Sequence, residues 1–295
     1  MSATGESLQP RERSVQCASP GGLHRMAYTE WGDPNNQNVL LCVHGLTRSG
    51  RDFDVLAQAF SRDYRVVCPD VVGRGRSGRL ADPQYYTVPQ YAADMVTLIA
   101  RLNVERVDWF GTSMGGLIGM TLAGLPDTPI QRMLVNDVGP RLGADAIQRI
   151  GDYLGRPVRF DSEQQAIDYL WQISASFGPH TPEQWQALSR PLLRQQDDGG
   201  WTLRYDPRIA EPFKATTPEQ AEQGEKMLWG AIEAFDGPLL IVRGAKSDLL
   251  SADTAQEIVS RARQAQVVEV PGVGHAPTFV DPAQIQIART FFIGR

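Results

Sequence analysis

The chain has 295 residues, of which 42% are hydrophobic and 21% are charged, and its net charge is −5. This length suits one large domain that carries an insertion, and the composition is that of an ordinary folded protein. The 29 Lys and Arg residues are scattered and fewer than the 34 Asp and Glu residues, so we expect neither a nucleic acid nor an anionic membrane surface as a partner.

The N-terminal segment lacks the apolar core of a secretory signal, and no apolar run approaches the roughly 18 residues of a membrane span. Cys17, Cys42 and Cys68 cannot all pair, and the last two lie in apolar runs. These features favour buried thiols in a reducing compartment. We therefore predict a cytoplasmic protein whose residues 1–14 form a flexible tail.

Short runs rich in Val, Ile and Leu alternate with amphipathic segments, which predicts parallel strands separated by helices. After an antiparallel strand at Leu23–Trp31, the predicted strands are Val39–Val43, Arg65–Cys68, Val107–Phe110, Met133–Val135, Leu239–Val242 and Val267–Val270. The predicted helices are Asp52–Phe60, Val88–Leu102, Met114–Leu125, Ala255–Arg263 and Ala283–Phe292. Residues 15–140 and 237–295 thus form the predicted α/β core.

The first motif, His44-Gly45-Leu46, follows the predicted strand Val39–Val43. In acyl transfer, an oxygen gains negative charge in the transition state, and backbone N–H groups aimed at it lower the barrier. The N–H groups of Leu46 and Met114 are the predicted donors of this oxyanion hole. We expect His44 to hold this loop and to be one of the residues that contact the substrate.

A glycine-rich segment, residues 70–78, follows the predicted strand Arg65–Cys68. It has no Lys-Ser or Lys-Thr pair after its glycines, so it is not a phosphate-binding P-loop. The prediction is a structural loop beside the site, in which Arg74, Arg76 and Arg79 are solvated surface charges, with contact to an anionic substrate as the alternative.

Gly111, Ser113 and Gly115 form a G-x-S-x-G pattern between the predicted strand Val107–Phe110 and the predicted helix Met114–Leu125. A serine in such a strand-to-helix turn takes a strained backbone conformation that exposes its hydroxyl at the carboxyl edge of the sheet. Ser113 is therefore the predicted nucleophile.

Residues 141–236 lose the strand pattern and become rich in aromatic residues, with prolines that divide the segment. A segment of this length must fold on another surface, so we predict a helical cap inserted between two strands of the sheet. Trp171 and Trp229 are the predicted aromatic contacts to the substrate.

His275 follows the last predicted strand, after two glycines that permit a sharp turn. A serine nucleophile needs a base near neutral pH, and histidine has the appropriate pKa. Of the other histidines, His24 lies in a strand, His44 in the oxyanion loop and His180 in the cap. His275 is therefore the predicted general base.

Together these motifs resemble the α/β-hydrolase superfamily from about Leu23 onward. They are, in order, His44-Gly45, Asp70-x-x-Gly73-x-Gly75-x-Ser77-Gly78, Gly111-x-Ser113-x-Gly115 and Gly274-His275. The resemblance implies an eight-stranded, mostly parallel sheet flanked by helices, with an inserted cap. The scaffold serves many reactions, so the resemblance leaves the substrate open.

The resemblance leaves two positions for the triad acid. In most of the family the acid follows the strand before the last in a G-x-x-D pattern, but here Ser247 takes that place and Asp248 comes one residue later. In another branch, which includes bacterial short-chain esterases and 2-(acetamidomethylene)succinate hydrolase, the acid follows the strand after the nucleophile helix. Asp137 has that position, and we favour it over Asp248.

The predicted function is hydrolysis of a small or medium carboxylic ester, thioester or lactone through an acyl-enzyme on Ser113. Two alternatives remain open: hydrolysis of a carbon–carbon bond in aromatic ring-fission products, and a non-catalytic relative that binds a ligand. We expect no cofactor and no metal, because the four histidines are widely separated and there is no C-x-x-C pair. Association into a homodimer is also left open.

Overall fold

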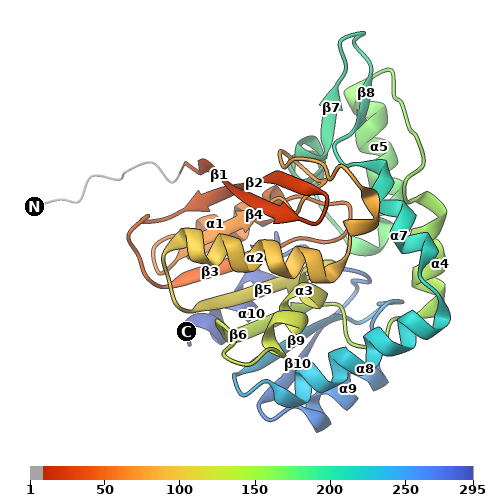
Figure 1. Ribbon diagram of the computed structural model, residues 1–295. Coiled ribbons are helices and arrows are strands. Elements are labelled where there is room, and N and C mark those ends of the chain that lie inside the picture. The colour runs from red at the N-terminus through yellow and green to blue at the C-terminus, as the bar shows by residue number, and fades with distance from the viewer. Residues whose placement is uncertain (1–8, 295) are drawn as a thin grey trace, which may run out of the picture.

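An eight-stranded sheet forms the centre of the molecule (Figure 1), and this computed structural model describes residues 9–294. The strands, in chain order, are β1 (Arg11–Ser19), β2 (Gly22–Trp31), β3 (Val39–Val43), β4 (Arg65–Pro69), β5 (Val107–Thr112), β6 (Ile130–Asn136), β9 (Leu239–Gly244) and β10 (Ala265–Val270). Their order across the sheet is β1-β2-β4-β3-β5-β6-β9-β10, and only β1–β2 and β2–β4 pair antiparallel. The predicted fold class is confirmed.

Helices cover both faces of this sheet. One face carries α2 (Val88–Leu102), α3 (Met114–Ala123), α8 (Pro218–Ala234) and α9 (Ala252–Arg261), and the other carries α1 (Asp54–Phe60) and α10 (Pro282–Ile293). Successive side chains of a strand point to opposite faces. Leu41 and Trp109 thus join the first apolar cluster, and Leu40 and Phe110 the second. Because both faces are buried, the strands appear in the sequence as continuous apolar runs.

A cap stands at the end of the molecule where β7 and β8 are labelled in Figure 1. It contains α4 (Ala144–Tyr153), α5 (Glu163–Ile173), α6 (Pro182–Ser189), β7 (Leu193–Gln195), β8 (Trp201–Leu203) and α7 (Ala210–Ala215). Short 3₁₀ turns lie in the core at Gly50–Phe53 and Pro83–Tyr85, and in the cap at Ala175–Phe177, Arg190–Leu192 and Pro207–Ile209. An apolar cluster centred on Ile167, Leu170 and Trp185 gives the cap its own small core. The β7–β8 hairpin corrects the expectation of a wholly helical cap.

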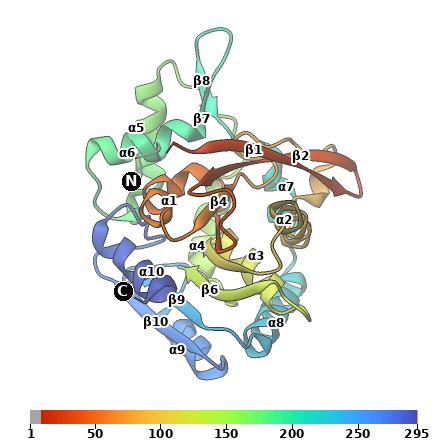
Figure 2. The same ribbon diagram turned by 90° about the vertical axis from the view of Figure 1, so that its left-hand side faces the viewer.

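Two predicted boundaries also differ from the structure. The helix α8 falls in the segment predicted as cap, but its Trp229 and Ile232 belong to the main core cluster, and Figure 2 shows α8 near the opposite end of the molecule from β8. Residues 11–14 of the predicted tail belong to β1, whereas residues 1–8 lie outside the described part. Within residues 9–294, no helix is long and apolar enough to cross a bilayer.

Candidate active site

Ser113 lies in a tight turn between β5 and α3, with φ 51° and ψ −117°. A positive φ is strained for a residue other than glycine, and here it lifts the side chain out of the turn. The neighbouring glycines are required by close approaches. A Cβ atom on Gly115 would lie 1.9 Å from the carbonyl oxygen of Val43, and one on Gly111 would lie 2.3 Å from that of Gly115. The G-x-S-x-G spacing therefore follows from the packing of α3 against β3 and β5.

Three segments that follow β5, β6 and β10 bring Ser113, Asp137 and His275 together. His275 Nε2 lies 3.0 Å from Ser113 Oγ, and His275 Nδ1 lies 2.8 Å from Asp137 Oδ2. If Nδ1 carries the ring proton, it donates to the carboxylate and leaves the Nε2 lone pair facing the serine hydroxyl. The predicted nucleophile and base are thus in contact, with a buried carboxylate behind them.

The two candidate acids have different surroundings. Asp137 is fully buried, and its carboxylate accepts hydrogen bonds from the Gly244 N–H at 2.8 Å and the Ser247 hydroxyl at 2.7 Å. Asp248 is partly exposed and forms an ion pair with Arg149 instead. Ser247, which stands where most of the family has its acid, is therefore a hydrogen-bond donor to Asp137. The structure places Asp137, and not Asp248, against His275.

The loop after β3 is held by His44, which is fully buried. Its Nε2 accepts a hydrogen bond from the Val71 N–H at 2.9 Å, and its Nδ1–H donates to the Gly45 carbonyl at 2.7 Å. Burial lowers the pKa of His44 to about 3, so the ring is neutral. The backbone N–H of Arg48 also donates to the Gly45 carbonyl. In a trans peptide the C=O and N–H groups point to opposite sides, so the Leu46 N–H, which shares a peptide with this carbonyl, points away from His44 and the Arg48 N–H. The prediction that His44 contacts substrate is corrected: it positions this loop.

Arg74 is also buried, with 1% of its surface exposed, so its interpretation as a solvated surface charge is wrong. Its Nε–H donates to the Leu46 carbonyl at 2.8 Å, and its Nη2 lies 3.6 Å from Met114 Sδ. The guanidinium also donates to the Tyr91 hydroxyl and lies over the ring of Tyr91, 4.9 Å from its centroid. Arg74 thus connects the two residues whose N–H groups are the predicted oxyanion donors. Arg76 pairs with acidic side chains and is partly exposed, and Arg79 is exposed.

Two cavities meet at Ser113, and both are lined by Leu46, Ser113 and Ile150. The first, about 80 Å³, is called the polar cavity here, and its walls include Arg48, Asp52, Arg149, Ser174, His275 and Thr278. The second, about 260 Å³, is called the apolar cavity, and its walls include Tyr91, Met114, Leu117, Val138, Leu142 and Phe213. The serine hydroxyl is therefore accessible from two sides that differ in polarity.

Neither predicted tryptophan lines these cavities, so their prediction as substrate contacts is corrected. Trp171 on α5 is 42% exposed and packs edge-on against Trp185 of the cap core. Trp229 on α8 is buried in the main core, below the guanidinium of Arg261. The aromatic walls come from other cap residues, such as Phe177. Sequence spacing gave no signal for this choice, because it depends on the path of the cap over the sheet edge.

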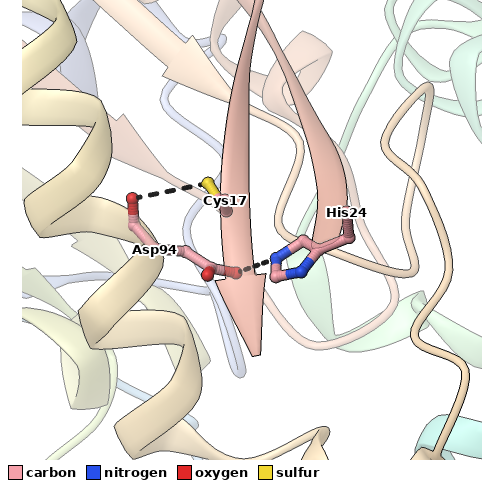
Figure 3. A group of neighbouring side chains, drawn as sticks. All are labelled: Cys17, His24 and Asp94. Carbon is pink, nitrogen blue, oxygen red and sulfur yellow. Dashed lines mark hydrogen bonds and ion pairs between the residues drawn. The ribbon is translucent and has the colours of Figure 1, made fainter. Parts of the chain in front are cut away.

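Cys17, His24 and Asp94, all residues of metal-ligating types, form a separate group (Figure 3), and none of them lines either cavity. Cys17 and His24 face each other across the β1–β2 hairpin, and donor atoms of Cys17, His24 and Asp94 lie within 4.8 Å of one another. His24 Nε2 already lies 2.9 Å from Asp94 Oδ2, and Gln90 donates to the other carboxylate oxygen at 2.8 Å. Burial and Asp94 raise the pKa of Cys17 to about 12. Structural zinc sites use four protein ligands, with cysteine as thiolate. We therefore interpret this group as a buried link between the hairpin and α2.

Comparisons with known proteins bear on the family, the fold and the class of reaction. The model of the alpha/beta hydrolase family matches residues 40–285. A 3-hydroxybutyrate-oligomer hydrolase of Cupriavidus necator is 62% identical over 98% of this chain and 99% of its own. The structure of a putative hydrolase from Rickettsia typhi aligns with TM-score 0.87 at 29% identity, covering 97% of this chain and 99% of the other. That of E-2-(acetamidomethylene)succinate hydrolase aligns with TM-score 0.80 at 22% identity over 97% and 100%, which bears on the fold alone.

The chain belongs to the alpha/beta hydrolase family, as its motifs predicted. Within that family it is a carboxylic ester hydrolase, and the predicted class of reaction is confirmed.

Proposed function

We propose that Ser113 is the nucleophile of this ester hydrolase, that His275 is its general base and that Asp137 orients the histidine. The observation that supports this most directly is the unbroken chain of contacts from Ser113 Oγ through both nitrogens of His275 to Asp137 Oδ2, at 3.0 and 2.8 Å. The Ser113 end of this chain of contacts lies where the two cavities meet, and there a substrate carbonyl can reach the hydroxyl. Nucleophile, base and acid thus have the relationship that acyl transfer needs.

In this reaction His275 Nε2 takes the hydroxyl proton as Ser113 Oγ attacks the ester carbonyl carbon. The carbonyl oxygen becomes an oxyanion, to which the Leu46 and Met114 N–H groups donate. Collapse of this intermediate breaks the ester C–O bond, and the alcohol leaves with the proton from His275. A water molecule, deprotonated by the same histidine, then attacks the acyl-enzyme, releases the carboxylic acid and restores the serine.

We further propose that the substrates are short linear oligoesters of 3-hydroxybutyrate. The support is the 62% identity to a 3-hydroxybutyrate-oligomer hydrolase along almost the full length of both chains. An oligoester extends on both sides of each ester bond, and the serine has a cavity on each side. The apolar walls of the larger cavity fit the methyl-bearing backbone of such a chain.

The direct test is to incubate the purified protein with the 3-hydroxybutyrate trimer and measure monomer and dimer by liquid chromatography. We expect rapid release of monomer, and no release by the Ser113→Ala variant, which also fails to react with a fluorophosphonate probe. Cleavage of p-nitrophenyl butyrate without cleavage of the trimer would reject the proposed substrate. Turnover by Ser113→Ala at the native rate would reject the proposed nucleophile.

A further inference from the structure

We propose that the polar cavity binds the free carboxylate end of the oligoester, so that the enzyme removes one hydroxy acid at a time from that end, with Arg149 as the carboxylate-binding residue. This inference rests on the proposed function, because it takes Ser113 as the nucleophile and an oligoester as the substrate. It assigns a direction to the bound chain and a ligand to a cavity wall.

The position of His275 determines which part of the substrate lies on which side. The departing alcohol oxygen must receive a proton from His275 Nε2, so the alcohol portion lies on the histidine side of Ser113. His275 lines the polar cavity and is not among the residues that line the apolar cavity. The alcohol portion therefore occupies the polar cavity, and the acyl portion occupies the apolar one.

The chemistry of a hydroxy acid oligomer then fixes the chain direction. At every ester bond, the acyl side leads to the free hydroxyl end and the alcohol side leads to the free carboxyl end. The polar cavity is less than a third of the volume of the apolar cavity, at about 80 against 260 Å³. The smaller space suits one terminal four-carbon unit, and the larger space suits the remaining chain. Each cycle thus releases one hydroxy acid as the leaving alcohol.

The charges of the two cavities agree with this direction. The walls of the apolar cavity contain no charged side chain, whereas those of the polar cavity contain Arg48, Arg149 and Asp52. Arg48 is 8% exposed, and its Nε and Nη2 bond both oxygens of Asp52 at 2.7 and 2.8 Å, while Nη2 also bonds the Leu188 carbonyl at 3.1 Å. The charge of Arg48 is thus balanced within the cavity wall by Asp52, whereas Asp248, the partner of Arg149, does not line the cavity, so Arg149 gives the wall its net positive charge.

Arg149 on α4 has a geometry suited to this role. Its side chain is 39% exposed, and it bonds Asp248 through Nε at 2.9 Å and Nη2 at 3.0 Å. Nη1 takes no part in these bonds, and Asp248 itself is not on the cavity wall. A guanidinium is planar and permanently charged, and it donates stronger hydrogen bonds to a carboxylate than neutral groups do. Asp248 thus holds Arg149 from outside while the cavity offers a place for the substrate carboxylate.

The test compares the 3-hydroxybutyrate trimer with its methyl ester, which lacks the terminal charge, in four proteins. These are the native chain, Arg149→Gln, Asp248→Asn and Arg141→Gln. Asp248→Asn breaks the same link between α4 and the core but keeps the guanidinium. Arg141→Gln removes an exposed, ion-paired arginine that lines neither cavity. A trimer with an isotopic label in its carboxyl-terminal unit shows which end is released first.

The native protein is expected to prefer the free acid and to release the labelled unit first. Arg149→Gln should lower kcat/KM for the free acid by about three- to tenfold, mainly through KM. Its losses with the methyl ester and with p-nitrophenyl butyrate should be smaller than its loss with the free acid, since neither has the charge. Asp248→Asn and Arg141→Gln should keep the preference for the free acid.

Three results would overturn the inference. They are equal native rates for the two trimers, release of the unlabelled end first, and equal losses in Arg149→Gln and Asp248→Asn with both trimers. The last would mean that Arg149 only links the cap to the core. All three leave the proposed function intact, whereas failure to cleave either trimer would reject that function itself.

Discussion

Asp137 shows how hydrogen bonds can stabilise the charge of a fully buried carboxylate. A buried carboxylate is costly unless its oxygens accept hydrogen bonds. Here three donors surround it: the Gly244 N–H, the Ser247 hydroxyl and His275 Nδ1. Gly244 ends β9 and Ser247 lies in the loop that follows, so this part of the chain fixes the triad acid although it does not supply that acid. Removing the charge should therefore affect the histidine more than the fold.

We predict that Asp137→Asn lowers kcat by about 10³- to 10⁴-fold on p-nitrophenyl butyrate. An asparagine at this position can present its NH₂ group to Nδ1, which favours the tautomer that places the ring proton on Nε2, where it cannot accept from Ser113. The control is Asp248→Asn, which should stay within about threefold on this neutral substrate. A larger loss in Asp248→Asn than in Asp137→Asn would contradict the assignment.

Arg74 is a positioning residue in this account, since it holds the Leu46 carbonyl and contacts Met114 Sδ without lining either cavity. We predict that Arg74→Met lowers kcat by about 10- to 100-fold with a smaller change in KM, because the oxyanion donors lose their alignment. A transition-state analogue such as a boronic acid should lose affinity in parallel with kcat. The partly exposed Arg76, replaced by Gln, serves as the control. Unchanged affinity for the analogue would assign Arg74 to stability alone.

At the level of elements, the sequence predicted the strands that are buried on both faces, because such strands form continuous apolar runs. β3 has its predicted bounds, and β4 and β5 differ only at their C-terminal ends. The edge strand β1 was missed, since exposed polar residues such as Glu12 and Ser14 interrupt its pattern. A strand that pairs on one side only needs less apolar surface, and its sequence resembles that of a loop.

The site was predictable in the same uneven way. Ser113 and His275 stand out because the glycines beside them mark sharp turns after strands. The burial of Arg74 could not be predicted, because a lone arginine between glycines resembles a surface residue until the cap covers it. Likewise, helix α4 is amphipathic, but only the path of the chain determines that its Arg149 and Ile150 line a cavity that Ser113 also lines.

The packing of α3 against β3 gives a prediction on stability. We expect Gly115→Ala to lower the free energy of unfolding by about 3 kcal/mol or to prevent folding, because the added Cβ would overlap the Val43 carbonyl, which is backbone and cannot move aside. Gly224→Ala in α8 is the matched control: no atom lies within 4 Å of its added Cβ, so it should raise helix stability by up to about 1 kcal/mol. Urea unfolding measures both. A native-like value for Gly115→Ala would show that the turn tolerates a side chain.

For the whole molecule, stability depends on pH through groups that folding buries. Burial raises the pKa of the carboxyl groups of Asp52, Asp54 and Asp70, so their protonation favours the folded state as the pH falls. The neutral His44 acts in the opposite direction. Its pKa is about 3 in the folded protein and about 6.5 in the unfolded chain, so between these values only the unfolded chain takes up the proton. The contribution of His44 is complete above pH 6.5 and decreases below it.

We predict that, between pH 7.5 and pH 5, the free energy of unfolding of the native protein falls by about 2 kcal/mol relative to that of a variant with no titratable side chain at position 44. His44→Gln is that variant. It should be less stable than the native protein at pH 7.5, where the loop loses a hydrogen bond, and the difference should shrink or reverse at pH 5.

Burial also lowers the pKa of His180, so His180→Gln should flatten the pH dependence in the same sense. Urea unfolding of the native protein and both variants at the two pH values measures these effects. Because all three proteins have the same carboxyl groups, the differences between them report the contribution of each histidine. A constant difference between native protein and His44→Gln would mean that His44 takes up a proton as readily in the folded protein as in the unfolded chain, and the neutral acceptor assigned to its Nε2 at pH 5 would then be wrong.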